Sequence, residues 1–420
     1  MSQPPLIFII AGEASGDKLG AELMASLKQN HPVHFTGIGG EAMAAQGLTS
    51  LFPMEELSLI GVWSILKNLP SLLGRLSYTV KTIREMKPDA VITIDAPEFN
   101  FRVHKRLRQD NDRPRQIHYV APTVWAWRPW MAKKVAGFLD HLLCLFPFEP
   151  PYFEKYGLKT TFVGHPLVRN TGLLRFARND DREETMLHTK PVIASPAESR
   201  AKQSRLLHKR DPKLLCVLPG SRRSEVERLL PIFKETVLLL KKELPHIQVI
   251  LPTVPAVEPF VREGVKDWPV EVDVVLGDEA RHTAFGKASV ALAASGTVAL
   301  QLAAANLPFV IAYKVDTVNE WIARLLFRTP WVCMVNILLV FQKFGPNFVL
   351  TPQAKELVPD PWIPEFLQKD CTAEKIAPAV LKLLIDRKAQ ADQHKALQEA
   401  VSLLEAPPEL VANTVWEEIL

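Results

Sequence analysis

Residues 6–20, LIFIIAGEASGDKLG, join a short apolar run, a glycine turn and the start of an amphipathic stretch in direct succession. The apolar run is typical of a buried strand in a parallel sheet, and the stretch after the turn has helical spacing. Gly12, Ser15 and Gly16 let the backbone approach another group closely at a helix N-terminus. The turn matches neither GxGxxG nor GxxxxGK[ST], and a tight turn with Asp17 as the helix cap is the alternative explanation.

The same alternation of apolar runs and amphipathic stretches recurs along the chain in two series. The first series predicts strands at 6–12, 90–97, 117–122, 142–147 and 160–166, and the second predicts them within 213–225, 247–252, 272–277, 289–297 and 309–314. Strands that alternate with helices on this scale predict two doubly wound α/β domains in tandem. Ligands of such sheets bind beyond the carboxyl ends of the strands.

The chain has 420 residues, which is too long for one ordinary domain. We expect a first domain over 1–169, a second over 213–363 and a helical tail over 364–420. The segment between the domains, 170–212, is dense in charge and has no sustained period, so we expect a surface linker that is partly disordered. A regulatory arm is the alternative for this segment.

The charge, the cysteine positions and the apolar runs of the chain exclude several classes of protein. The net charge of +4 is spread along the chain without the basic arms of nucleic-acid binders, so no nucleic-acid partner is expected. The four cysteines are far apart and lack metal-ligand spacing, so we expect buried reduced thiols. The sequence shows no secretory leader and no apolar run of about 18 residues, which predicts a cytoplasmic protein without a membrane span.

Two further glycine turns lie in the second series. In LPGSRRSEVERLL (218–230), Arg222 and Arg223 follow a strand and open a helix, where a guanidinium can hold a diphosphate bidentately. In AASGTVALQLAAA (293–305), the turn Ser295–Thr297 also precedes a helix. The two loops together predict a nucleotide diphosphate site, whereas plain helix capping explains either loop alone.

The first series carries candidates for acid–base and sugar chemistry. Asp95 follows an apolar strand, where partial desolvation raises a carboxyl pKa and suits a general base; capping of the next helix is the alternative. Trp127 and Arg128, in YVAPTVWAWRPW (119–130), suit a sugar or acyl site, although the tryptophans could instead plug the sheet end. For His165 in VGHP, a structural role is the alternative to a functional one.

Residues 56–76, ELSLIGVWSILKNLPSLLGRL, carry more apolar surface than a single core-facing helix face needs, and Pro70 interrupts the stretch. With Lys67 and Arg75 beside it, such an element can lie in a lipid interface without spanning the bilayer. A core helix is the alternative. The expected membrane contacts are Leu59, Val62, Trp63, Leu66, Leu69 and Leu73.

Eight motifs, in this order, are similar to those of the bacterial lipid-A-disaccharide synthases. They are AGEASGD, GIGGEAM, IDAPEFN, YVAPTVWAWR, LFPFE, VGHP, LPGSRRSEVE and ASGTVALQ, and the resemblance covers most of 5–169 and 213–340. It implies a GT-B glycosyltransferase with two Rossmann-like domains that joins UDP-2,3-diacylglucosamine to 2,3-diacylglucosamine 1-phosphate through a β-1,6 linkage. It further implies no metal, no cofactor and action on the inner face of the inner membrane. The helical tail would pack back on the first domain or cross to a partner in a homodimer.

The resemblance also implies residue roles. Asp95 matches the essential acidic residue and Arg222 the functional arginine of the family, so these are the expected catalytic residues. Asn336 resembles an asparagine of the family's active site. The expected substrate-binding residues are Glu13, Ser15, Gly16, Asp17, Asn100, Trp127, Arg128, His165, Gly220, Ser221, Glu225, Ser295, Gly296, Thr297, Gln301 and Asn336.

The sequence departs from the family pattern at four places. Gln301 stands where a glutamate is usual, which predicts weaker rather than lost binding of ribose hydroxyls. Val335 replaces a proline, and 342–363 and 170–212 are longer than expected. Two rival functions use the same fold: a UDP-sugar 2-epimerase, and a non-catalytic membrane-associated binding protein.

Overall fold

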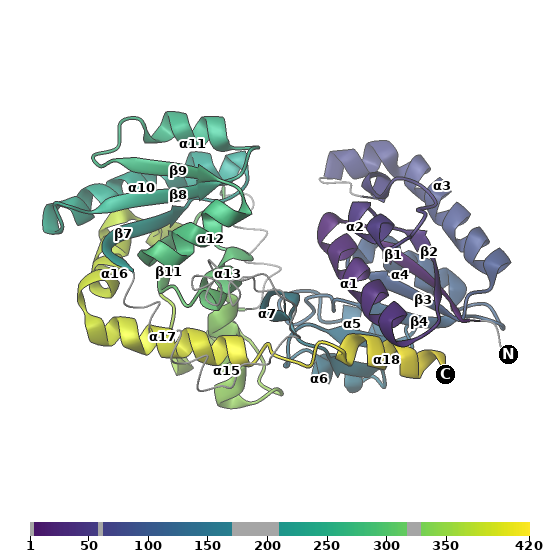
Figure 1. Ribbon diagram of the computed structural model, residues 1–420. Coiled ribbons are helices and arrows are strands. Elements are labelled where there is room, and N and C mark those ends of the chain that lie inside the picture. The colour runs from purple at the N-terminus through teal and green to yellow at the C-terminus, as the bar shows by residue number, and fades with distance from the viewer. Residues whose placement is uncertain (1–3, 58–61, 170–209, 317–328) are drawn as a thin grey trace, which may run out of the picture. The chain divides into compact units, whose positions relative to one another are not determined.

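The computed structural model describes residues 4–57, 62–169, 210–316 and 329–420, and only the backbone of 62–69. The chain divides into two compact units (Figure 1). The first comprises residues 1–169 with 404–420, and the second comprises residues 170–403.

The first unit is built on a six-stranded parallel sheet with strand order β2-β1-β3-β4-β5-β6. Its strands are β1 (Leu6–Ala11), β2 (His34–Ile38), β3 (Ala90–Ile94), β4 (Arg115–Tyr119), β5 (His141–Cys144) and β6 (Lys159–Phe162). Its helices are α1 (Ala14–Asn30), α2 (Glu41–Ala45), α3 (Val62–Met86), α4 (Pro97–Leu107), α5 (Met131–Ala136), α6 (Pro150–Glu154), α7 (Pro166–Arg169) and α18 (Leu410–Ile419). All five residues of β3 are buried, as expected of a central parallel strand that is covered on both faces.

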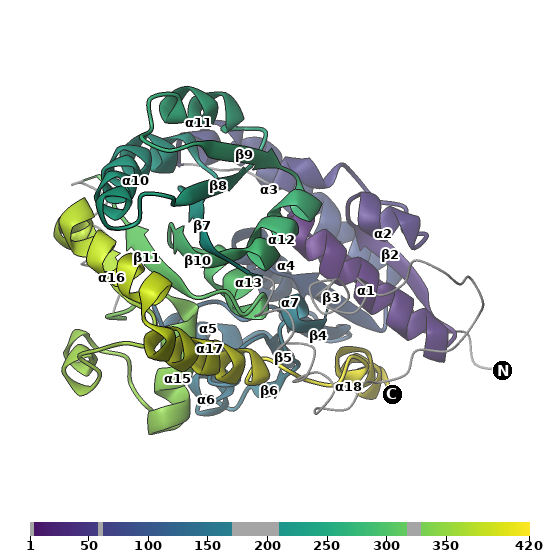
Figure 2. The ribbon, with the colours of Figure 1, turned by 60° about the vertical axis from the view of Figure 1, so that its left-hand side comes forward.

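The second unit repeats this plan with strand order β12-β11-β10-β7-β8-β9. Its strands are β7 (Asp211–Leu218), β8 (Gln248–Thr253), β9 (Val272–Leu276), β10 (Ala288–Ala293), β11 (Phe309–Tyr313) and β12 (Glu365–Leu367). Its helices are α10 (Arg223–Glu243), α11 (Glu258–Val265), α12 (Asp278–Lys287), α13 (Val298–Ala304), α15 (Met334–Phe344), α16 (Ala373–Ile385) and α17 (Arg387–Ser402). Figure 2 shows the strands of this sheet with α10, α11 and α16 around them, and side chains of these elements form one core cluster.

The segment after residue 363 is shared between the units. Strand β12 extends the second sheet, α16 and α17 pack in the second unit, and only residues 404–420 join the first. The segment expected to form a single helical tail is therefore divided between the two units. Its larger part belongs to the second unit, because the apolar face of α16 is buried against α10 and the second sheet.

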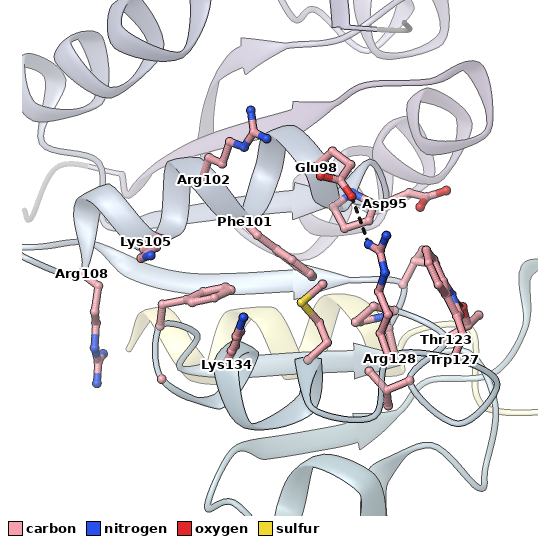
Figure 3. Close-up of a pocket in the computed structure, with 18 of the residues that line it drawn as sticks. Asp95, Glu98, Phe101, Arg102, Lys105, Arg108, Thr123, Trp127, Arg128 and Lys134 are labelled. Carbon is pink, nitrogen blue, oxygen red and sulfur yellow. Dashed lines mark hydrogen bonds and ion pairs between the residues drawn. The ribbon is translucent and has the colours of Figure 1, made fainter. Parts of the chain in front are cut away.

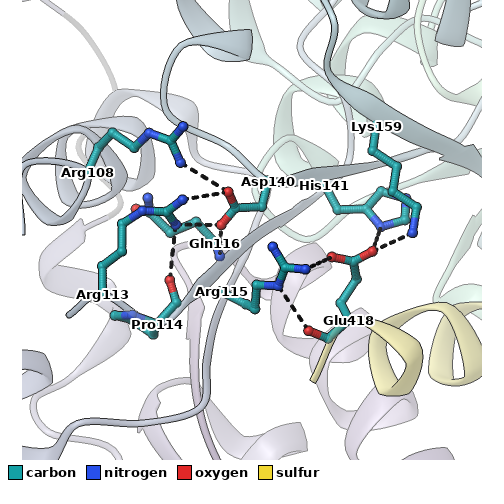
Figure 4. A network of polar contacts seen from close by, with 9 residues as sticks. All are labelled: Arg108, Arg113, Pro114, Arg115, Gln116, Asp140, His141, Lys159 and Glu418. Carbon is teal, nitrogen blue, oxygen red and sulfur yellow. Dashed lines mark hydrogen bonds and ion pairs between the residues drawn. The ribbon is translucent and has the colours of Figure 1, made fainter. Parts of the chain in front are cut away.

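Helix α18 is held on the first sheet by a buried carboxylate, shown in Figure 4. Glu418 pairs with Lys159 at 2.5 Å and with the His141 ring at 3.2 Å, and its backbone carbonyl accepts a hydrogen bond from Arg115. Burial acts to raise the pKa of Glu418, but these partners hold it below its usual range. Helix α18 is thus fixed to the sheet by charge, and it also packs on α1, because Trp416 stacks on His31, the C-cap residue of α1, with the ring centroids 3.9 Å apart.

Three details bear on the sequence expectations. All four cysteines are buried and free, which confirms that expectation. Helix α3 runs through Pro70 rather than stopping at it, so the interruption expected there is wrong. No helix within the described ranges is long and apolar enough to cross a bilayer.

Candidate functional site

Each sheet has one point where the strand order reverses. In the first, the chain leaves β1 for β2 on one side and later returns to β3 on the other; in the second, β7 and β10 flank the corresponding point. Loops that leave two such neighbouring strands diverge and open a crevice, which is where doubly wound sheets bind ligands. The three glycine turns follow β1, β7 and β10, and Asp95 follows β3. The residues predicted to form the site therefore gather at the two reversal points.

In the first unit, the loop after β1 touches the loop after β3. A Cβ at Gly12 would lie 2.7 Å from the Cβ of Ala96, so glycine is required for this approach. Asp95 and Ala96 both have positive φ, 49° and 43°, a conformation uncommon outside glycine. The Asn100 amide holds this turn by donating to the carbonyl of Asp95 at 2.7 Å. Strained backbone of this kind persists where the surrounding structure fixes it, and it concentrates at functional sites.

Asp95 is partly buried, and burial raises its pKa above the usual range of an aspartate. Glu13, at the N-cap of α1, also has a raised pKa, first because of burial and then because of the charge of Asp95. The two carboxyl groups therefore share one edge of the sheet. A carboxylate that is costly to keep ionised takes up a proton more readily, which suits a general base.

A pocket of about 850 Å³ lies beside Asp95, between α4, α5 and the loop after β4 (Figure 3). Its lining combines apolar side chains with five cations, Arg102, Lys105, Arg108, Arg128 and Lys134, and its two carboxylates are Asp95 and Glu98. Val120, which also lines it, has φ +82°, a rare value for a β-branched residue. The pocket is suited to a ligand that is apolar over part of its length and anionic elsewhere.

The three tryptophans of the loop after β4 have different environments. Trp125 is buried and donates to Glu149 at 3.3 Å, so it plugs the core; Trp130 is exposed. Trp127 lines the pocket, and the Arg128 guanidinium lies 3.9 Å from its ring centroid. Of the three, Trp127 is therefore the tryptophan placed to meet a ligand.

Glu149 belongs to the motif LFPFE, and its importance was not predicted. Its buried carboxyl accepts hydrogen bonds from Trp125 and from the backbone N–H groups of Leu145 and Phe146. Burial raises the pKa of Glu149 to about 8. A lone glutamate just after a buried strand was the available signal, and its role is to tie the Trp127 loop to the end of β5.

Asp17 is 5% exposed, and its carboxylate accepts hydrogen bonds from the backbone N–H groups of Gly40, Ala42 and Met43 at 2.7–3.1 Å. It therefore caps α2, rather than its own helix as the alternative explanation had it. These internal bonds favour a structural role for Asp17 over contact with substrate.

Replacing Asp17 with alanine would leave the N-terminal amides of α2 without an acceptor. We expect the free energy of unfolding to fall by about 2–3 kcal/mol in urea titrations. The folded Asp17→Ala protein should keep its KM values, and an unchanged stability with a raised KM would instead indicate substrate contact.

In the second unit, Gly220 and Glu225 build the loop after β7. Gly220 has φ +114°, and a Cβ there would lie 2.5 Å from a carboxylate oxygen of Glu225. Glu225 is buried and accepts from the backbone N–H groups of Ser221 and Arg222 at 3.1 and 3.3 Å, and from Tyr313. These contacts give Glu225 and Gly220 a positioning role for the loop.

Arg222 is the N-cap residue of α10, and its side chain is 77% exposed. Its closest acidic neighbour is Glu225 at 3.6 Å. The next arginine, Arg223, is instead bonded to Glu227 at 2.6 Å and stacked on Phe260. Arg222 is thus the more available guanidinium, beside helix-start amides that lack intrahelical partners.

The loop after β10 lies next to the loop after β7, because β7 and β10 pair and Ala294 donates to the carbonyl of Leu218 at 2.8 Å. Ser295 is partly buried, whereas Gly296 and Thr297 are exposed, and Gly296 has φ +147°. Gln301 lies one helical turn further along α13 and is partly buried. The structure therefore brings the predicted diphosphate loops and Gln301 to one edge of the second sheet.

Three residues that were predicted to bind substrate form hydrogen bonds within the protein instead. Asn336 is fully buried in α15 and exchanges hydrogen bonds with the backbone of Ile363, so it closes the longer 342–363 segment. Asn100 holds the Asp95 turn. The Nδ1 atom of the His165 ring accepts a hydrogen bond from the backbone N–H of Leu167, and the backbone N–H of His165 donates to the carbonyl of Leu404. These contacts favour positioning roles over direct contact with substrate.

The predicted membrane contacts are only partly described. Leu59, and the side chains of Val62, Trp63, Leu66, Lys67 and Leu69, lie outside the described residues. Leu73 is 41% exposed, whereas Leu76 is 2% exposed and belongs to the core. Arg75 is paired with Glu56 at 2.6 Å. The described half of α3 thus has a core face with Leu76 and an outward face with Leu73.

Comparison with known proteins identifies the family. A family model described as lipid-A-disaccharide synthetase matches residues 7–413. Lipid-A-disaccharide synthase from Rhodospirillum centenum is 45% identical, covering 100% of this chain and 96% of the relative. The enzyme of that name from Paramagnetospirillum magneticum is 42% identical, covering 99% and 97%.

Solved structures support the fold alone. A glycotransferase of kitacinnamycin matches with a TM-score of 0.58 at 13% identity, covering 100% of both chains. The UDP complex of MnaA from S. aureus matches with a TM-score of 0.56 at 12% identity, covering 100% of this chain and 98% of the other. The two parallel sheets and these neighbours establish the GT-B fold expected from the sequence. From the family match over nearly the whole length, the chain belongs to the lipid-A-disaccharide synthases and is a hexosyltransferase of lipid A biosynthesis.

Proposed function

We propose that this chain transfers 2,3-diacylglucosamine from UDP to the 6-hydroxyl of 2,3-diacylglucosamine 1-phosphate, with inversion to a β-1,6 linkage. The observation that carries this mechanism is the position of Asp95: a strained, partly buried carboxyl group of raised pKa at the strand reversal point, beside a large apolar and cationic pocket. The family assignment favours this reaction over epimerisation and over non-catalytic binding.

In the proposed reaction, Asp95 takes the proton of the acceptor hydroxyl as its oxygen attacks the anomeric carbon of the donor. The bond from that carbon to the diphosphate breaks through a transition state with oxocarbenium character, and UDP leaves with the electron pair. Arg222 and the loop Ser295–Thr297 would stabilise the charge that builds on the diphosphate, since such donors act most strongly where charge develops. Gln301 would hydrogen-bond the ribose.

The decisive experiment follows UDP release and products by mass spectrometry, with purified protein and UDP-2,3-diacylglucosamine, with and without 2,3-diacylglucosamine 1-phosphate in mixed micelles. We expect UDP release that requires the acceptor and yields a disaccharide. Conversion of the donor to a 2-epimer without acceptor would support the epimerase alternative. Folded protein that binds UDP without turnover would support the binding protein.

We also propose that the protein lies peripherally on the cytoplasmic face of the inner membrane through residues 56–76. Leu73→Glu puts a charge on an exposed leucine and is expected to reduce sedimentation with vesicles of phosphatidylethanolamine and phosphatidylglycerol. Leu238→Glu is the matched control, because Leu238 is 46% exposed on α10 of the other unit. Both variants should keep their stability within about 0.5 kcal/mol. Equal vesicle binding by the two variants would contradict the proposed surface.

A further inference from the structure

The pocket beside Asp95 has two chemically different ends. Asp95 and Glu98 lie at the end where β3 passes into α4, and Arg108, after the other end of α4, lines the far side. In Figure 3, Asp95 and Arg108 lie at opposite ends of the group of side chains, with Phe101, Lys105 and Lys134 between them. A single ligand in this pocket would therefore meet carboxylates at one end and cations along the rest.

The wall between these ends is apolar. Phe101, Val124 and Phe138 are each less than 10% exposed and belong to one core cluster, and Met131 packs against that cluster. Because these side chains are fixed by the core, the wall is available to a ligand without reorganisation of the protein. Contact with it would stabilise a bound hydrocarbon chain by removing apolar surface from water.

The five cationic side chains that line the pocket, called its rim below, differ in whether an acidic side chain already pairs with them. Arg128 pairs with Glu98 at 3.7 Å, and Arg108 pairs with Asp140 at 3.0 Å. Arg102, Lys105 and Lys134 form no ion pair with any described residue. Arg102 and Lys105 are three residues apart on α4, so they project from adjacent turns of the same helix, and Lys134 lies across the pocket on α5.

We infer that this pocket binds the phosphorylated diacyl acceptor, with its phosphate on Arg102, Lys105 and Lys134 and an acyl chain along the Phe101–Phe138 wall. The inference rests on the proposed function, which places the acceptor hydroxyl at Asp95. A dianionic phosphate would complement these three cations, which form no ion pair within the described part of the chain, and charge-assisted hydrogen bonds are the stronger class. The Asp95 carboxylate repels a phosphate, whereas the cations attract it, so the sugar is oriented with its hydroxyl toward the carboxylate.

Two other occupants explain the pocket less well. The donor carries its charge on a diphosphate, for which the second unit has its own loops and Arg222. A membrane headgroup needs only a surface patch of cations, whereas this site is a hollow of about 850 Å³, within the size range of small-ligand pockets. The combination of an apolar wall and several cations in one hollow fits one amphipathic anion.

The test variant is Arg102→Gln/Lys105→Gln/Lys134→Gln. Its control, Lys81→Gln/Arg106→Gln/Lys133→Gln, removes the same number of charges from α3, α4 and α5 at positions that do not line the pocket. In neutral micelles we expect the test variant to raise the KM for the phosphorylated acceptor about 10- to 100-fold, with kcat and the donor KM little changed. The control should match the wild type.

An acceptor without the 1-phosphate isolates the role of the phosphate. The wild type should use 2,3-diacylglucosamine with a raised KM, and the test variant should raise that KM no further, since the two changes remove the same interaction. Equal losses with both acceptors would mean that the cations do not contact the phosphate, which would overturn the inference.

The remaining outcomes distinguish failure of the proposed transferase function from failure of the proposed acceptor pocket. Wild-type turnover with an unchanged acceptor KM in the test variant would overturn the pocket assignment and leave the transferase function intact. Without wild-type turnover, the function would fail, and equilibrium binding of the acceptor in micelles would still test the pocket through the two triple variants. Loss of binding only to vesicles of phosphatidylcholine and phosphatidylglycerol, with normal binding of the acceptor, would identify a membrane headgroup and overturn the inference.

Discussion

Asp95→Asn is expected to reduce kcat by about 10²- to 10⁴-fold, the typical cost of losing a general base. The amide cannot take the proton of the acceptor hydroxyl, although it keeps nearly the same shape. Asparagine is the informative replacement because it tolerates the φ of 49° found here better than alanine does. Circular dichroism and urea unfolding should therefore give wild-type values, and the KM for the donor should change little.

The pH dependence gives a second readout for Asp95. A base must be ionised, so kcat/KM should fall as the pH falls through the pKa of Asp95, which burial raises above the usual 3.8. Asp95→Asn should abolish this acid limb in its residual activity. Glu98→Gln tests the other carboxylate that lines the pocket, which is 73% exposed; a larger loss there than in Asp95→Asn would move the base to Glu98.

The sequence predicted most of the fold because its signals are local. Five-residue apolar runs such as β3 are buried on both faces, and the glycine turns after them match their strands and helices. The interruption expected at Pro70 is wrong because α3 continues through this residue, although a proline removes one intrahelical hydrogen bond. The division of the C-terminal segment depends on which core buries α16, and amphipathic spacing carries no information on the partner.

The candidate site was only partly predictable for a related reason. Motifs located Asp95 and Arg222, which follow strands in sequence as well as in space. They could not show that Asp17 caps α2 or that Asn336 binds Ile363, because both partners are more than 20 residues away. Lys134 was missed altogether: it joins Arg102 and Lys105 in lining the pocket only after β4 and the following loop have folded back. The spacing of Arg102 and Lys105 beside Phe101 was the one local signal of that rim.

Arg222→Gln is expected to lower kcat by about 10²- to 10³-fold, by analogy with the removal of one donor from a site where negative charge develops. The guanidinium would interact more strongly with the departing diphosphate than with the bound donor, so kcat should suffer more than the donor KM. Stability should not change, because the side chain is 77% exposed and the loop is held by Glu225 and Gly220 instead.

Arg223→Gln is the matched control for this prediction. It removes a neighbouring guanidinium that is already bonded to Glu227 and stacked on Phe260, so its effect on kcat should stay within a few-fold. Arg222→Lys should recover part of the lost rate, since it restores the charge without the bidentate fork. Steady-state kinetics with saturating acceptor would measure all three variants. Equal losses in Arg222→Gln and Arg223→Gln would mean that the rate depends on the general positive potential of the α10 start. A specific contact with the diphosphate requires that only the exposed, N-cap arginine carries the effect.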